Sequence, residues 1–259
     1  MGKKVPRLAQ RLDVSHLFKF RLLQILTLLG LCGLNWHHAM ADVLSPFAAA
    51  SSSKVPAPWL YVALPERYAK PPTTIDVQTV DGKKVLRLLA DKSWGTVAHP
   101  WSGAAKTMTF QWRLDKALTQ ASFKGKATED TALKVCASFD MPEDRIPSGE
   151  RTLFKLAQFF SKEKLPTATL CYVWANAEAM GTIHHSPTTA RVRYMVLDTG
   201  AQQLKTWKQH TRNVAEDFLK AFGAETNTVP AITAIIVGAD ADNTSSSSLG
   251  YIADLSLLP

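Results

Sequence analysis

The residues with the most evident chemistry lie in the stretch VGADADNT, residues 237–244. Asp240 and Asp242 stand one residue apart there, and Asn243 follows at once. Calcium prefers about 6–8 oxygen ligands, and this loop offers few charged ones. An EF-hand also alternates its acids before a sixth-position glycine, and Asn243 breaks that alternation. We expect a turn whose Asp and Asn side chains accept from backbone N–H groups just ahead. Calcium at Asp240 and Asp242 is the alternative.

A second group of candidate residues is aromatic. Trp94 and Trp101 bracket GTVAHP, which is predicted to be a loop. An exposed indole beside polar groups suits a sugar ring, whose C–H faces are apolar and whose hydroxyls need hydrogen bonds. Asn176, just past a predicted strand, is a further ligand-binding candidate. Tyr172 and Trp174 on that strand are interpreted as core, as most strand aromatics are.

Arg191 and Arg193 share one face of a predicted strand. Two neighbouring guanidinium groups could hold a carboxylate or a phosphate in bidentate fashion. The alternative is a solvated outer face, or pairing with acids on adjacent strands. We count both arginines among the ligand-binding candidates.

Catalytic patterns are weak in this sequence. Downstream of residue 41 the histidines are His99, His184, His185 and His210. His184 and His185 would point to opposite faces of a strand, which makes a poor metal clamp. GxSxG, HExxH, P-loop and GxGxxG motifs are absent, and no spacing marks a glycosidase pair of acids. We therefore nominate no catalytic residue and no cofactor.

The first 41 residues have the features of an export signal. A basic region precedes an apolar stretch, Leu22 to Leu34, and then the small-x-small triplet Ala39-Met40-Ala41. We expect cleavage after Ala41, which predicts a periplasmic or secreted protein that meets the membrane only during export. Removing the signal takes six of 30 basic and one of 22 acidic residues, so the net charge falls from +8 to +3. No basic run remains to bind nucleic acid.

Cys136 and Cys171 are the two cysteines left after that cleavage. They lie in different predicted strands, and an exported chain can form a disulfide between them. The alternative is that each is a small buried residue with a free thiol. Both interpretations stay open, because strand register cannot be read from sequence alone.

The remaining pattern is mostly strands. Two extended runs in residues 74–90 flank Asp81-Gly82, a typical tight hairpin turn. In residues 107–114 apolar and polar residues alternate, which predicts one buried face. Residues 231–238, AITAIIVG, are nearly all apolar and predict a strand that is buried on both faces or central in its sheet.

Two helices interrupt the strands and should cover the sheets. One carries a stripe of Leu153, Leu156, Ala157 and Phe160, and Asn213 with Glu216 can cap the other. The predicted fold is an antiparallel two-sheet β-sandwich, of jelly-roll or galactose-binding-like type, over residues 59–259. Residues 42–58 should form a flexible lead-in.

Several motifs together resemble a bacterial exported family catalogued as domain of unknown function 3047. They are TLCYVW, RVRYMVLDTG, NVAEDFLKAFG, VPAITAIIVGADADNT and the closing YIADLSLL. The resemblance implies an exported, mostly β domain without an established activity. In that pattern an acid usually follows the YVW tryptophan, whereas this chain has Ala175.

The signal, the sandwich pattern and the tryptophans favour a non-catalytic binding domain for a glycan or another polar component of the cell envelope. The alternative is an envelope hydrolase that uses carboxylates such as Asp240 and Asp242. A deep cleft with a carboxylate of raised pKa would favour the hydrolase.

Overall fold

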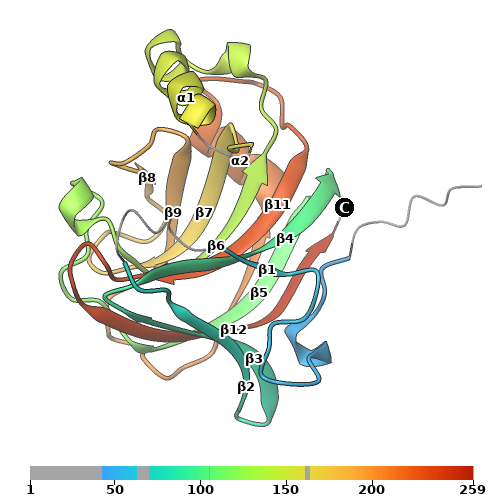
Figure 1. Cartoon of the computed structure of the whole chain (residues 1–259), viewed down its shortest axis with the longest axis vertical. Coiled ribbons are helices and arrows are strands. Elements are labelled where there is room, and N and C mark those ends of the chain that lie inside the picture. Colours follow the sequence, from blue (N-terminus) through green and yellow to red (C-terminus); the bar gives the residue numbers. More distant parts are fainter. Residues whose placement is uncertain (1–42, 63–69, 105, 161–163, 259) are drawn as a thin grey trace, which may run out of the picture. The chain divides into compact units, whose positions relative to one another are not determined.

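The computed structural model describes residues 43–62, 70–104, 106–160 and 164–258. The expected signal peptide, residues 1–41, lies outside the described residues. Residues 42–259 form a unit of their own. They are built from two stacked β-sheets (Figure 1), as the alternating pattern predicted.

Sheet A has seven strands and sheet B has five. In spatial order, sheet A contains β1 (Leu60–Val62), β4 (Trp94–Gly103), β11 (Ile232–Asp240), β6 (Thr131–Phe139), β7 (Ala168–Ala175), β9 (Val192–Thr199) and β8 (Ile183–His185). Sheet B contains β10 (Lys208–Asn213), β5 (Thr107–Lys116), β12 (Ser247–Leu258), β3 (Lys83–Asp91) and β2 (Thr74–Val80). Adjacent strands are antiparallel except β7 and β9, which run parallel. Sheet A is therefore mixed, unlike the fully antiparallel expectation.

The core fills the space between the sheets. Along β5, Met108, Phe110, Trp112 and Leu114 are buried while the residues between them are half-buried, as the period-two alternation predicted. Tyr172 and Trp174 of β7 are also in this core, confirming their interpretation. β11 lies between β4 and β6, so residues 231–238 are indeed central in their sheet.

The hairpin between β2 and β3 turns at Asp81 and Gly82. Both have positive φ angles, 50° and 78°, as a two-residue turn between twisted strands requires. The register Val80↔Lys83 confirms the predicted hairpin.

Two α-helices accompany the sheets, α1 (Ser148–Phe160) and α2 (Val214–Phe222). Asn213 caps α2, where its Oδ1 accepts from the Glu216 N–H at 3.2 Å. The expected stripe of α1 is wrong, because Leu153 and Leu156 are exposed and Phe154 is the buried residue. Among the described residues, neither helix has the length and apolarity to cross a membrane.

The segment before β1 differs from expectation. Three short 3₁₀ helices occur in the described residues, at Phe47–Ala49 (η1), Lys126–Thr128 (η3) and Glu143–Arg145 (η4). Phe47 of η1 packs against Trp59 with ring centroids 5.0 Å apart, and both side chains are buried in the core. Leu44, Phe47 and Ala50 of the expected lead-in are therefore buried against the sandwich, whereas residues 51–54 are exposed.

Candidate functional site

The stretch VGADADNT runs from inside β11 into the turn that follows it. Asp240, the last residue of β11, is buried and accepts from both the backbone N–H and the hydroxyl of Thr131 on β6. Its other oxygen lies 3.3 Å from Lys134 Nζ. Burial raises the pKa of Asp240, Lys134 and Thr131 oppose the rise, and the charge of Asp130 adds to it.

The turn after β11 is held by a residue far away in the sequence. Asp130 Oδ1 accepts from the Asn243 N–H at 3.1 Å, and its Oδ2 accepts from the Thr244 N–H at 2.8 Å. The expected local Asx contacts of Asp240 and Asp242 are therefore wrong. Asp130 instead accepts the backbone N–H groups of the turn. Sequence reasoning missed Asp130 because the pairing between β6 and β11 cannot be read from the sequence.

Asp242 completes a cluster of three buried aspartates, which we call the aspartate cluster: Asp130, Asp240 and Asp242. One carboxylate oxygen from each lies within 4.8 Å of the other two. Asp242 Oδ2 is 3.5 Å from Lys70 Nζ, and Oδ1 is buried without a hydrogen-bond partner among the described residues.

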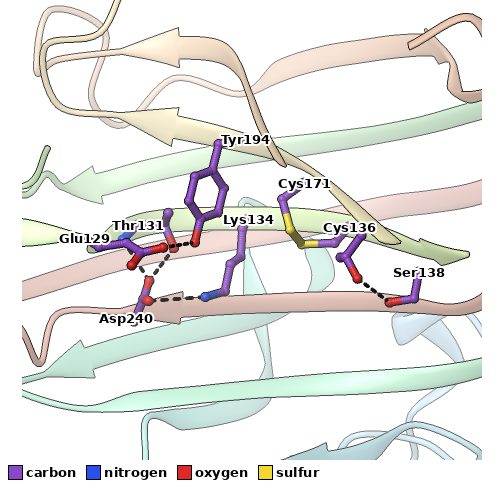
Figure 2. Close-up of a disulfide and its surroundings, with 9 residues drawn as sticks. Glu129, Thr131, Lys134, Cys136, Ser138, Cys171, Tyr194 and Asp240 are labelled. Atoms are coloured by element: carbon purple, nitrogen blue, oxygen red, sulfur yellow. Dashed lines mark hydrogen bonds and ion pairs between the residues drawn. A yellow bond between two sulfur atoms is a disulfide. The ribbon is translucent and has the colours of Figure 1, made fainter. Parts of the chain in front are cut away.

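A fourth carboxylate lies beside this cluster on the outer face of sheet A (Figure 2). Glu129 is 5% exposed, and its carboxylate accepts from the hydroxyls of Ser186, Thr188 and Tyr194. Burial and the charges of Asp240 and Glu129 raise the pKa of Tyr194, which stays protonated as the donor.

A disulfide joins Cys136 and Cys171 on the same face (Figure 2). The two residues are register partners on β6 and β7, with their Cα atoms 4.0 Å apart. Of the two interpretations left open by the sequence, the structure has the disulfide.

The two candidate arginines do come together, but around a carboxylate of the protein itself. Glu225 receives Arg191 through both oxygens, at 2.7 and 3.0 Å, and Arg193 Nη2 at 2.7 Å. Glu150 also pairs with Arg191. The side chains of Arg191, Arg193 and Glu225 are at most 7% exposed. In this Arg191–Glu225–Arg193 network, the bidentate partner that the sequence predicted to be a ligand is therefore a carboxylate of the protein itself, which corrects that prediction. Arg191 Nε and Arg193 Nε, however, have no hydrogen-bond partner among the described residues.

The tryptophan prediction also needs correction. GTVAHP is part of strand β4, and Trp94 and Trp101 lie on that strand. Trp101 is 8% exposed and belongs to the core. Trp94 is half-buried, with Lys134 Nζ 5.5 Å from its ring centroid and Asp240 as its register partner. The continuous strand arises because GTVAHP pairs with β11, and that pairing is not visible in the sequence.

Asn176 has a structural role. Its Nδ2 donates to the carbonyl oxygens of Thr119 and Ala121, at 3.1 and 3.2 Å, and ties down the segment after β5. The candidates from the sequence thus separate: Trp94, Asp240, Asp242 and Asn243 lie together. Trp101, Asn176 and the arginines do not join them.

Sequence reasoning did not identify a second polar surface, on the outer face of sheet B. Tyr251 of β12 has Arg87 of β3 and Arg113 of β5 as register partners. Its neighbour Ile252 points into the core, so Tyr251 points outward. We call the row around it the sheet B face: Asp76, Asp81, Arg87, Arg113, Asp115, Trp207 and Tyr251.

Bidentate pairs fix the two arginines of the sheet B face. Arg87 binds Asp76 at 2.8 and 2.7 Å, and Arg113 binds Asp115 at 2.6 and 3.0 Å. The Arg113 guanidinium lies 5.9 Å from the Tyr251 ring centroid. Since alternating polar residues on a strand usually indicate a solvated face, only the cross-strand register could have identified this row.

Trp207 lies at one end of the row. Its ring centroid is 6.5 Å from that of Tyr251, and its Nε1 donates to Asp81 Oδ2 at 3.1 Å. Arg113 Nη1 donates to the same oxygen at 2.8 Å. Trp207 is half-buried, so part of its ring faces solvent beside charged groups.

Two hollows occur elsewhere on the described surface. One, of about 460 Å³, lies beside α1 and includes Phe154, Leu165 and Arg191 in its lining. The other, of about 220 Å³, lies between residues 50–53 and β2. Asp240 and Asp242 line neither, so no substrate reaches them through these hollows.

Solved structures that match this chain in a structural comparison include an enzyme and a protein in complex with an oligosaccharide. A native family 12 xyloglucanase from Bacillus licheniformis matches at 8% identity and a TM-score of 0.42, covering 80% of this chain and 100% of that one. TmCBM61, solved in complex with β-1,4-galactotriose, matches at 10% identity and a TM-score of 0.33, covering 78% and 88%. With TM-scores below 0.5, neither likeness bears on what this chain binds.

Among curated proteins, no sequence matches this chain. A family model described as protein of unknown function, DUF3047, matches residues 57–256. That range begins before β1 and ends within β12, and it contains the aspartate cluster and the sheet B face. The chain belongs to this DUF3047 family.

Proposed function

We propose that this protein is an exported, non-catalytic domain that binds a glycan of the cell envelope through the sheet B face. The single observation that carries the proposal is the row across the sheet, in which two aromatic rings lie among fixed arginine–aspartate pairs. A pyranose ring presents apolar C–H groups to an aromatic ring and hydroxyls to charged neighbours. Trp207, which is half-buried, offers the first kind of contact, and Arg87, Arg113 and Asp81 offer the second. Tyr251 itself is 8% exposed and packs beside the Arg113 guanidinium.

The state of the carboxylates favours binding over hydrolysis. A glycosidase needs one carboxyl group that carries a proton as the general acid. Asp76 and Asp115 each receive an arginine through both oxygens, so these oxygens already serve as hydrogen-bond acceptors. The contacts of these carboxylates with the arginines therefore suit the role of hydrogen-bond acceptor better than that of general acid.

The proposed location rests on two features. The first 41 residues have the order of an export signal. The Cys136–Cys171 disulfide suits an oxidising compartment, because cytosolic thiols are kept reduced. Both features support a periplasmic or secreted protein.

The test is a panel of immobilised envelope and extracellular polysaccharides, probed with the purified protein. We expect retention on at least one polysaccharide and a roughly tenfold weaker affinity for Trp207→Ala, because an aromatic contact contributes about 0.5–1.5 kcal/mol beyond its buried area. Tyr61→Ala is the matched control, since it removes a 43% exposed ring from β1 of the other sheet. Absence of binding across the panel, or equal losses in both variants, would overturn the proposal.

A further inference from the structure

The charges around the aspartate cluster do not balance. Asp130, Asp240 and Asp242 are 1%, 4% and 6% exposed. The cationic neighbours found in the described residues are Lys134, which is buried, and Lys70, whose side chain is 37% exposed. The three buried carboxylates therefore outnumber their two ammonium partners. Buried charge without compensation is costly.

An unpartnered oxygen indicates where further positive charge belongs. Asp242 Oδ1 is buried and has no hydrogen-bond partner among the described residues. The lysine contact of this side chain is on Oδ2, and the Asp242 backbone carbonyl accepts from Lys70 at 2.9 Å. A buried carboxylate oxygen normally has a donor or a metal ion. The same side chain contributes a ligand atom within 4.8 Å of Asp130 and Asp240.

The neighbouring hydrogen bonds leave oxygen lone pairs for a ligand. The donors to Asp130 come from the turn, at Asn243 and Thr244, and the donors to Asp240 come from Thr131 and Lys134. Each carboxylate oxygen can accept more than one contact. These bonds orient the carboxylates in the way that outer contacts orient metal ligands.

We propose that Asp130, Asp240 and Asp242 bind a divalent cation that prefers oxygen ligands, with Ca²⁺ as the ion. Carboxylate oxygens without nitrogen or sulfur favour calcium over zinc or copper. A cation at this point would also offset the excess of carboxylates over ammonium groups. The ion would tie the end of β11 to the start of β6, because the three ligands come from those two places in the fold.

Terbium luminescence tests this on the purified protein after removal of cations with EDTA. Tb³⁺ replaces Ca²⁺ at oxygen sites and emits when a nearby tryptophan is excited. Trp94 is the register partner of Asp240 and so is well placed as the donor. We expect tryptophan-excited emission that Ca²⁺ competes away, and a rise of several degrees in the melting temperature when Ca²⁺ is added.

Three variants make the result specific. Asp242→Asn should weaken Tb³⁺ binding at least tenfold and abolish the calcium-dependent rise in melting temperature. Trp94→Phe should lower the emission while keeping that rise, which separates the donor from the ligands. Asp140→Asn, an exposed aspartate at the end of β6, is the matched control and should behave as wild type.

Calorimetric titration of the wild-type protein with Ca²⁺ tests directly whether the protein binds the ion, and it needs no variant. Saturable binding of one ion supports the site. Absence of heat, of emission and of a calcium effect on melting would show that the aspartates serve only as hydrogen-bond acceptors of the turn. An unchanged response in Asp242→Asn would place the ion elsewhere and overturn the proposal equally.

Discussion

The aspartate cluster and the Arg191–Glu225–Arg193 network are both buried charge groups, yet they differ in balance. In the network, two arginines face Glu225 and Glu150, so cations and anions are equal in number. In the cluster, carboxylates outnumber ammonium groups, and one oxygen of Asp242 has no partner in the described residues. The comparison teaches that burial and charge alone do not mark a ligand site. The proposed calcium site differs from the network by its excess of carboxylates over cations.

The largest effect should come from breaking the balanced group. Glu225→Gln leaves two buried guanidinium groups without their shared anion, and we expect a loss of about 3–5 kcal/mol in the free energy of unfolding. Urea denaturation measures it. Glu143→Gln, at an exposed position, is the control and should change stability by less than about 0.5 kcal/mol. If Glu225→Gln lowered the free energy of unfolding by as little as the control, the network would not stabilise the fold.

Removing the disulfide should give the next largest effect. Cys136 lies two residues from Lys134 on β6, and the crosslink closes a separation of 35 residues. Replacing both cysteines by alanine should lower the free energy of unfolding by about 3–4 kcal/mol, because the unfolded chain regains loop entropy. Mass spectrometry should find no alkylatable thiol at these positions before reduction. Two free thiols in the unreduced, unfolded protein would refute the crosslink.

The smallest effect on stability should come from Asp198, a buried carboxylate whose two oxygens both accept hydrogen bonds. Asp198 accepts from Trp112 Nε1 and His210 Nε2, both at 2.8 Å, and from Lys208. Burial alone would raise the pKa of Asp198, but His210, Lys208 and Trp112 bring it below its ordinary 3.8. Its stabilisation is therefore fully present above that pH and is lost as the pH falls through the lower, folded-state pKa.

The check is the melting temperature against pH, from roughly pH 6 down to pH 2. The wild type should lose stability more steeply below 3.8 than Asp198→Asn does. Parallel curves for the two proteins would contradict the assigned contacts.

Local patterns in the sequence predicted the elements but not their neighbours. The Asp81-Gly82 turn, the alternation along β5 and the Asn213 cap are each set by residues adjacent in the chain, and all three are confirmed. The stripe of α1 failed because a helix at the margin of a sandwich buries only part of its apolar surface. Leu153 is 68% exposed and Phe154 only 6%.

The candidate sites depended on register, which the sequence does not encode locally. Asp130 meets Thr244 across 114 positions, and Arg87 meets Tyr251 across sheet B. The sequence therefore indicated Asp240 and Asp242 without their third partner. The sequence also predicted that Trp101 binds a sugar from a loop, whereas Trp101 lies on strand β4 and is buried in the core. Arg191 and Arg193 do pair with acids of the protein, but these acids are Glu150 of α1 and Glu225 after α2 and do not lie on adjacent strands as expected.

The position of β12 in sheet B has a consequence for the rate of folding. β12 lies between β3 and β5, yet its Ser256 meets Thr109, 147 positions earlier in the chain. The middle strand of sheet B therefore pairs with two strands, β3 and β5, that lie far from it in the sequence. Such long-range closure slows folding.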